Sequence, residues 1–219
     1  MPTKLLFREN PYRLKFEARV SRIDGRNMVL DQTCFYPQGG GQVGDAGEID
    51  GIRVVDTRMD EDQKAVIHVL ESEPNLKICE TIHGCIDWNR RYRIMRLHSA
   101  AHIVYYLMQE VYGGNCKPVS SGLLDEKKDR SDYVFTDKLD KEKLEEVERR
   151  ANEVISKNHE IKVWGDKDNP HRRYWKIDPF PVMACGGTHV KNTEEIGRII
   201  VKRGHKPGRG KERIEILLA

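Results

Sequence analysis

The sequence has no long apolar run. No stretch approaches the roughly 20 consecutive apolar residues of a membrane-spanning helix, and the mean hydropathy is −0.68, so we expect no membrane partner. The first residues, MPTKLLFRENPY, carry charges and lack the apolar core of a secretory signal peptide. The length of 219 residues suffices for one large domain or two modest ones, and the hydrophobic content of 38% leaves room for their cores.

Cysteine is scarce, with five residues in all. This is an odd number, and the spacing shows no tight disulfide framework. We therefore expect free, mostly buried thiols and a reducing compartment, the cytoplasm. The formal net charge is only +3, so the position of the charges says more about a nucleic-acid partner than their sum. The cysteines are Cys34, Cys79, Cys85, Cys116 and Cys185.

The sequence predicts a β-barrel domain over residues 1–88 and an α+β domain over residues 89–219. In the first region, turn signals separate short apolar or alternating runs. Several short strands at this spacing are typical of a small barrel or an open sheet. The predicted strands are Lys15–Val20, Asn27–Leu30, Ile52–Thr57 and Ala65–Leu70.

Two helices are predicted in the second region. Apolar residues recur every three or four positions over Arg90–Tyr112, and Gly113-Gly114 would end this helix. A second helix is expected over about Lys138–Asn158, with Asp137 as its N-cap. Strands are expected at Asp132–Phe135, Ile161–Trp164 and Arg198–Val201.

Two pairs of side chains have the spacing of metal ligands. His98 and His102 stand four positions apart on the first helix, so their imidazoles lie one turn apart and about 40° apart around its axis. Cys185 and His189 flank a Gly-Gly-Thr sequence that lets the backbone curl around an ion. Taken singly, the first pair could be solvated histidines and the second a buried thiol beside a turn. A metalloprotease HExxH motif needs glutamate where this chain has Ser99.

Taken together, the two pairs predict a single zinc ion per chain with four ligands. Thiolate and imidazole are the ligands that tetrahedral zinc sites use. Structural zinc sites are closed by four protein ligands, whereas catalytic sites keep a position open for water. A structural zinc therefore remains an alternative to a catalytic one.

Residues 36–47, YPQGGGQVGDAG, form a glycine-rich segment. It is neither a P-loop, because no Gly-Lys-Ser/Thr follows, nor a GxGxxG dinucleotide motif. Such glycine density permits positive φ and a close approach of the backbone to a ligand or another domain. The segment is either a tight barrel turn or the lining of a small polar pocket. In the second case the candidate substrate contacts are Thr33, Gln38, Gly39, Gly40, Gly41 and Gln42.

Two basic clusters are candidates for contact with RNA phosphates. The first precedes the histidines and could instead be the solvated face of a helix. The second surrounds glycines near the C-terminus and could instead be a solvated loop. The candidate RNA-binding residues are Arg90, Arg91, Arg93 and Arg96 in the first cluster and Lys202, Arg203, Lys206, Arg209 and Lys211 in the second, which also holds His205 and Arg213.

These motifs together resemble the alanyl-tRNA editing proteins of the AlaX type, free-standing relatives of the editing domain of alanyl-tRNA synthetase. The resemblance spans nearly the whole chain, in content and in order. It runs through residues 33–42 (TCFYPQGGGQ), 87–88 (DW) with Arg91, 95–98 (MRLH), 185–190 (CGGTHV), 195–197 (EIG) and 213–215 (RIE).

The resemblance implies a barrel like that of translation factors, followed by an editing domain shared with threonyl-tRNA synthetases. It implies the longer class of the family, which carries the glycine-rich motif, and hydrolysis of tRNA(Ala) wrongly charged with serine or, in some members, glycine. The family's zinc ligands fall on His98, His102, Cys185 and His189. Relatives often have threonine directly after the first zinc histidine. Here Ser99 keeps the hydroxyl without the methyl, which affects the expected selectivity and not the reaction.

Hydrolysis of the aminoacyl ester needs a positioned water and stabilisation of the developing oxyanion. The candidate catalytic residues are His98, His102 and Ser99, and zinc could activate water, polarise the carbonyl or anchor the substrate's amino group. No carboxylate close in sequence to either ligand pair suggests itself as a general base. We expect Ser99, Thr33 or backbone amides near Gly40 to bind the serine hydroxyl, so that alanine leaves buried polar groups unpaired.

Two other functions fit part of the pattern. A non-catalytic RNA-binding module could contain a structural zinc. An unrelated zinc hydrolase of small esters or amides would explain the ligands but not the C-terminal basic cluster. The sequence gives no indication of protein partners or of the oligomeric state.

Overall fold

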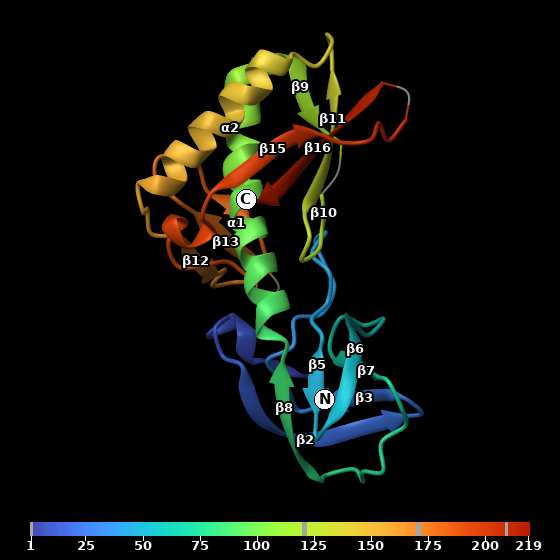
Figure 1. Ribbon diagram of the computed structural model, residues 1–219. Coiled ribbons are helices and arrows are strands. Elements are labelled where there is room, and N and C mark those ends of the chain that lie inside the picture. The colour runs from blue at the N-terminus through green and yellow to red at the C-terminus, as the bar shows by residue number, and fades with distance from the viewer. Residues whose placement is uncertain (1, 120–121, 170–171, 209) are drawn as a thin grey trace. The chain divides into compact units, whose positions relative to one another are not determined.

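A computed structural model describes residues 2–119, 122–169, 172–208 and 210–219 (Figure 1). Its internal contacts divide the chain into two compact units, which part within the first long helix, whereas the sequence placed the change of domain between residues 88 and 89. Where the functional domains divide stays a prediction. The first unit comprises Met1–Gly39 and Val43–Tyr92, and the second comprises Gly40–Gln42 and Arg93–Ala219.

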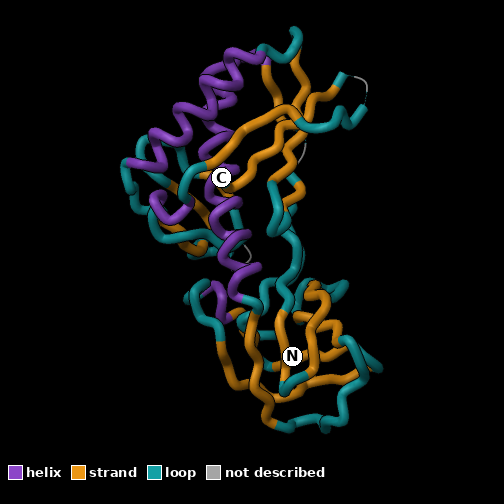
Figure 2. The backbone as a smooth tube through the Cα atoms, viewed as in Figure 1, coloured by secondary structure: helices purple, strands orange, loops and turns teal. Residues whose placement is uncertain are grey.

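The first unit contains a closed barrel of strands, coloured orange in Figure 2. Its six antiparallel strands follow the order β2-β3-β7-β6-β5-β8. Successive side chains of a strand point to opposite faces, and in β2 the alternate residues Phe16, Ala18 and Val20 are buried in the barrel core. The predicted β-barrel is confirmed. Its strands are β2 (Lys15–Asp24), β3 (Asn27–Leu30), β5 (Gly47–Ile49), β6 (Ile52–Met59), β7 (Val66–Leu70) and β8 (Thr81–Ile86), beside a parallel pair of β1 (Lys4–Leu5) and β4 (Gln32–Thr33) and the 3-10 helix η1 (Leu6–Arg8).

The second unit combines helices with two small sheets, so the α+β class is confirmed. One sheet has the order β10-β11-β16-β15, with β9 also paired to β11, and the other has the order β12-β13-β14. The elements are α1 (Trp88–Tyr112), η2 (Gly113–Asn115), β9 (Cys116–Pro118), β10 (Leu123–Leu124), β11 (Asp129–Phe135), α2 (Lys141–Ser156), β12 (Lys162–Gly165), β13 (Arg173–Lys176), β14 (Met183–Ala184), η3 (Thr193–Ile196), β15 (Ile199–Arg203) and β16 (Lys211–Leu218).

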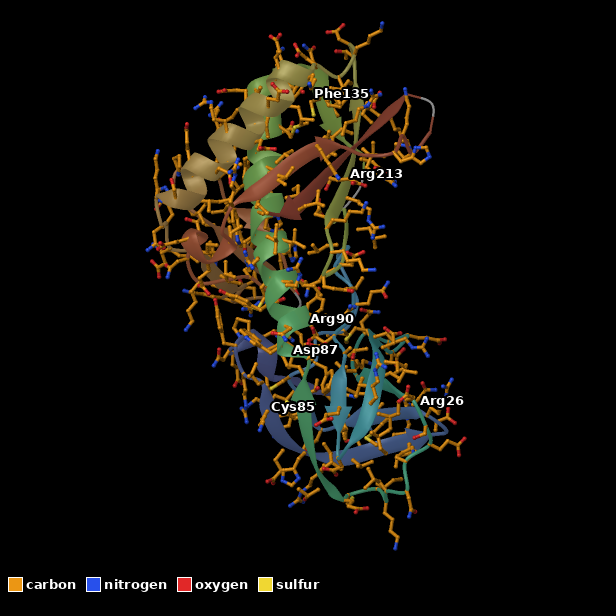
Figure 3. The ribbon with its side chains drawn as sticks, viewed as in Figure 1. Arg26, Cys85, Asp87, Arg90, Phe135 and Arg213 are labelled. Atoms are coloured by element: carbon orange, nitrogen blue, oxygen red, sulfur yellow. The ribbon has the colours of Figure 1, made fainter. Side chains whose placement is uncertain are left out.

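Both predicted helices are present. Asp87 lies directly before α1, where its carboxylate accepts a hydrogen bond from the Arg90 backbone N–H at 3.0 Å (Figure 3), and α1 ends before Gly113 as predicted. For α2 the predicted cap Asp137 is wrong. The carboxylate of Asp140 instead accepts hydrogen bonds from the backbone N–H groups of Glu142 and Lys143, which is the usual role of an N-cap.

Helix α2 packs against β15 (Figure 1). Its buried residues Leu144, Val147, Ala151 and Ile155 follow the helical repeat and face inward. From the same helix, the Asn152 amide accepts from the Ile199 N–H at 2.9 Å and donates to the Ile199 carbonyl at 3.0 Å, which satisfies both backbone groups.

The five thiols are free, as predicted. The expectation that most are buried is wrong, because only Cys34 and Cys116 are fully buried while Cys79 is exposed. No helix in the described part of the chain is long and apolar enough to cross a membrane.

Candidate metal centre

Four side chains from two chain segments converge in the second unit. His98 and His102 come from one face of α1, and Cys185 and His189 come from the loop that follows β14. One ligand atom from each lies within 4.8 Å of all the others. His98 and His189 are buried, whereas His102 and Cys185 are partly exposed. The structure thus brings together the four residues that the sequence selected.

The distances within this metal-ligand cluster suit a small cation. The Cys185 Sγ lies 3.5 Å from His98 Nε2 and 3.3 Å from His189 Nε2. Tetrahedral zinc with a Zn–S bond of about 2.3 Å and a Zn–N bond of about 2.1 Å needs an S···N separation of roughly 3.6 Å. The imidazole rings are close as well, with centroids of His98 and His189 4.3 Å apart.

The donor chemistry also fits a cation. Burial lowers the pKa of His98 to about 4 and the pKa values of His102 and His189 well below their ordinary value, so each ring is neutral near pH 7 and has a lone pair to donate. Burial raises the pKa of the Cys185 thiol to about 11. His102 Nε2 is buried without a hydrogen-bond partner in the described structure, an unfavourable state that a bound cation would relieve.

Ser99 lies behind His189 and is fully buried. Its hydroxyl donates to the Met95 carbonyl at 2.9 Å. With its single proton used there, the oxygen can only accept from His189 Nδ1 at 3.2 Å and from the Val190 N–H at 3.3 Å. The structure therefore places this hydroxyl among protein partners, which favours support of His189 over contact with a substrate.

Gln42 is the member of the glycine-rich segment that reaches the cluster. It is 1% exposed, and its Oε1 lies 2.9 Å from His98 Nδ1 and 3.1 Å from the Thr188 backbone nitrogen. Its Nε2 donates to the Thr188 hydroxyl at 3.0 Å. A Cβ on Gly187 would lie 2.2 Å from the His98 ring and 2.7 Å from Gln42 Oε1, so glycine is required between these partners.

The remaining predicted substrate contacts take different positions. Thr33 is buried in the first unit, and its hydroxyl lies 2.8 Å from His68 Nε2. Gln38 is exposed, and the Gly39 carbonyl accepts from the Tyr36 hydroxyl at 3.0 Å. Gly40 and Gly41 belong to the second unit and both have positive φ, 58° and 88°. Their contact with a substrate stays a prediction.

Arg91, a predicted RNA-binding residue, has its charge paired within the protein. The Arg91 side chain is fully buried in the first unit. Its guanidinium pairs with the carboxylate of Asp45 and also donates to the carbonyls of Pro11 at 2.9 Å and Cys34 at 2.7 Å. These partners give the guanidinium a stabilising role in the unit, and its contact with RNA stays a prediction.

The other members of the first basic cluster also make backbone contacts. Arg90 donates to the Gly44 carbonyl at 3.2 Å and Arg96 to the Ile196 carbonyl at 2.9 Å. Arg93 is exposed but donates to the Glu126 carbonyl at 2.9 Å.

The second basic cluster lies at the facing ends of β15 and β16. Arg203 and Lys206 both pair with Glu212, at 2.7 Å and 3.3 Å, which partly neutralises them. Lys202 and Lys211 are exposed. Arg213 on β16 (Figure 3) pairs with Asp132 at 2.7 Å, and Arg209 lies outside the described residues.

Sequence reasoning missed an aromatic wall beside the cluster. Trp175 of β13 is fully buried, with its ring centroid 4.8 Å from that of His102. Tyr106 stacks on Phe180 with centroids 5.1 Å apart and lies 6.5 Å from Trp175. The sequence signal for this wall was the i, i+4 spacing of His102 and Tyr106 on one helix face. This spacing does not show that β13, with Trp175, packs beside them.

Two family models match the chain. One, described as tRNA synthetases class II (A), matches residues 7–90. The other, described as the Threonyl and Alanyl tRNA synthetase second additional domain, matches residues 171–215, which include Cys185 and His189. The second match confirms the predicted type of the α+β domain.

Full-length relatives are also found. The alanyl-tRNA editing protein AlaX-M of Pyrococcus horikoshii is 39% identical, over 99% of this chain and 98% of its own length. AlaX-M of Saccharolobus solfataricus is 32% identical, over 97% of each chain. The alanine–tRNA ligase of Thermococcus kodakarensis is 33% identical over 97% of this chain, but the match covers 25% of the ligase. This chain therefore matches the two editing proteins over at least 97% of their length, and the ligase over a quarter of its length.

Proposed function

The chain belongs to the AlaX-M family of alanyl-tRNA editing proteins, and from this premise we propose that it is a trans-editing hydrolase of mischarged tRNA(Ala). Seryl-tRNA(Ala) is the main proposed substrate and glycyl-tRNA(Ala) the second. The observation that carries this proposal is the cluster of His98, His102, Cys185 and His189 in a chain that matches editing proteins over at least 97% of their length.

The proposed cofactor is one zinc ion per chain. Three neutral imidazoles and one thiol, with sulfur-to-nitrogen distances of 3.3 and 3.5 Å, are the donor set and spacing that zinc prefers. When bound, zinc would supply Lewis acidity toward the substrate.

The proposed reaction adds water across the aminoacyl ester. The water oxygen bonds to the acyl carbon, the bond from that carbon to the ribose oxygen breaks, and the ribose hydroxyl takes up a proton. Among the described contacts, no carboxylate hydrogen-bonds to the metal-ligand cluster. We therefore give the residues that contact the ligands a positioning role. Gln42 orients His98, and Ser99 orients His189.

Discrimination against alanyl-tRNA(Ala) requires a polar contact to the serine hydroxyl. Because Ser99 is occupied by Met95, His189 and Val190, we assign this contact to the backbone amides of Gly40 and Gly41. These glycines belong to the same unit as the cluster. Thr33, Gln38 and Gly39 remain further candidates within the first unit.

The proposed partner is the tRNA itself, in the cytoplasm. Lys202 and Lys211 are exposed at the β15–β16 end of the second unit, where they can reach phosphates. Arg93 supplies a further exposed cation on α1.

Hydrolysis of mischarged tRNA tests the proposal. The purified protein should deacylate seryl-tRNA(Ala) and leave alanyl-tRNA(Ala) largely intact. A chelator should abolish the activity, and added Zn²⁺ should restore it.

The four-ligand set also favours one alternative, a non-catalytic RNA-binding module with a closed structural zinc site. Retained RNA affinity with no deacylation would select this alternative. Hydrolysis of small esters without any effect of RNA would instead indicate an unrelated zinc hydrolase.

A further inference from the structure

The hydrogen bonds of Gln42 determine which nitrogen of His98 carries the proton. Gln42 Oε1 lies 3.1 Å from the Thr188 backbone nitrogen, which can only donate, so the amide atom at this position must be the oxygen. The same oxygen lies 2.9 Å from His98 Nδ1. Because an amide oxygen only accepts, Nδ1 of the neutral ring must carry the hydrogen. The lone pair of His98 is then on Nε2, the nitrogen 3.5 Å from Cys185 Sγ.

We propose that Gln42 is a positioning residue of the metal centre, which fixes His98 as the Nδ1–H tautomer with Nε2 directed at the cation. This inference rests on the proposed function in so far as it assumes that the cluster binds a metal. It gives the Gln42 side chain a role in supporting a ligand, in place of the contact with substrate that the sequence suggested. Hydrogen-bond partners of this kind set the tautomer, orientation and basicity of metal-bound imidazoles.

The surroundings of Gln42 hold its amide in place. Its backbone forms a bridge with Leu124 of β10, and the neighbouring Gly41 carbonyl accepts from the Leu124 N–H at 2.8 Å. Its side chain makes two hydrogen bonds to Thr188, which is itself buried. The positive φ of Gly41 suits a glycine. These contacts of Gly41 and Gln42 therefore hold the Gln42 amide beside His98.

Thr188 connects the two halves of the ligand set. It lies between Gly187 and the ligand His189, and it binds the same amide that supports the ligand His98. A shift of Gln42 would therefore act on the α1 ligands and on the loop ligands together. We therefore expect replacement of Gln42 to lower metal affinity by more than the loss of one neutral hydrogen bond would.

Replacement of Gln42 in the full chain separates a positioning role from simple packing. Gln42→Met keeps the length of the side chain but removes the acceptor, and we expect its zinc dissociation constant to rise by about 10- to 100-fold. Gln42→Glu restores an acceptor for His98 Nδ1 and should hold zinc more tightly than Gln42→Met. The control Gln38→Met, at an exposed position of the same segment, should leave zinc affinity unchanged. Affinity is measured by competition with a chromogenic chelator.

A second measurement does not depend on the metal. Long-range ¹⁵N–¹H correlation spectra of the metal-free protein report the tautomer of each histidine, and a His98→Asn spectrum assigns the signal. Wild-type His98 should be the Nδ1–H form, and Gln42→Met should shift it toward Nε2–H or a mixture.

The outcomes are distinct. An Nε2–H form of His98 in the wild type would overturn the inference, as would equal zinc affinity of wild type and Gln42→Met. If Gln42→Glu binds zinc as weakly as Gln42→Met, the Gln42 side chain contributes only packing, and the inference is overturned as well. A wild-type protein without zinc affinity would rule out zinc as the cofactor. The tautomer spectrum would still show whether Gln42 fixes the His98 tautomer.

Discussion

Replacing Ser99 by alanine tests whether its hydroxyl supports the metal centre or binds the substrate. In the structure the fully buried oxygen accepts from His189 Nδ1 and the Val190 N–H while it donates to the Met95 carbonyl. Ser99→Ala leaves two buried donors without an acceptor. Each orphaned donor costs about 1–3 kcal/mol, and allowing for relaxation of the neighbours we expect a loss of roughly 2–4 kcal/mol in the free energy of unfolding.

The functional consequence distinguishes the two roles. If the hydroxyl acts through His189, Ser99→Ala should weaken zinc binding and slow hydrolysis of seryl-tRNA(Ala) and glycyl-tRNA(Ala) by the same factor. Single-turnover rates at saturating zinc, alongside urea unfolding, measure both effects. Ser99→Thr retains the hydroxyl and should keep zinc affinity near that of wild type. A loss confined to seryl-tRNA(Ala), with zinc affinity intact, would refute this reasoning and return Ser99 to the substrate pocket.

Three further predictions concern stability and RNA binding. Burial raises the pKa of Asp129 to about 7, above its unfolded value near 3.9. The free energy of unfolding is therefore highest below about pH 4, where Asp129 is protonated in both states, and falls as pH rises to about 7. Asp129→Asn should flatten this dependence and stabilise the protein by about 2–4 kcal/mol at pH 8; urea unfolding curves that stay parallel to wild type from pH 5 to 8 would contradict it. Asp45→Asn strands the buried guanidinium of Arg91 and should cost about 3–5 kcal/mol, measured by thermal unfolding, and an unchanged melting temperature would argue against the pair. Replacing Lys202 and Lys211 by glutamine should reduce the slope of log affinity for tRNA against log salt by up to about 1 per lysine, and an unaltered slope would place the RNA elsewhere.

Local sequence pattern predicted much of the fold. Short apolar or alternating runs between turn signals identified β2, β3, β6 and β7, and the three-to-four-residue repeat identified α1 and α2. The strand β16 was missed because its first residues, with Lys211 and Arg213, resemble a basic loop. In the sheet Arg213 pairs with Asp132 of β11, a partner 81 positions away in sequence that no local pattern reveals.

The candidate site divides in the same way. Ligand pairs four residues apart carry a local signal, and the structure brings both pairs together. The partners behind the ligands carry none, since Gln42 and His98 are 56 positions apart and Ser99 and His189 are 90 apart. The sequence also contains no sign that Arg91 is buried. It stands in a run of arginines, and its partner Asp45 is distant in sequence.

The central claim is that one zinc ion in the metal-ligand cluster supports deacylation. The most direct measurement combines zinc content per chain with the single-turnover rate on seryl-tRNA(Ala), for wild type and Cys185→Ala. We expect one zinc per chain and rapid hydrolysis in the wild type, and loss of both in Cys185→Ala with the fold retained by circular dichroism. Full activity of a zinc-free Cys185→Ala protein would contradict the account.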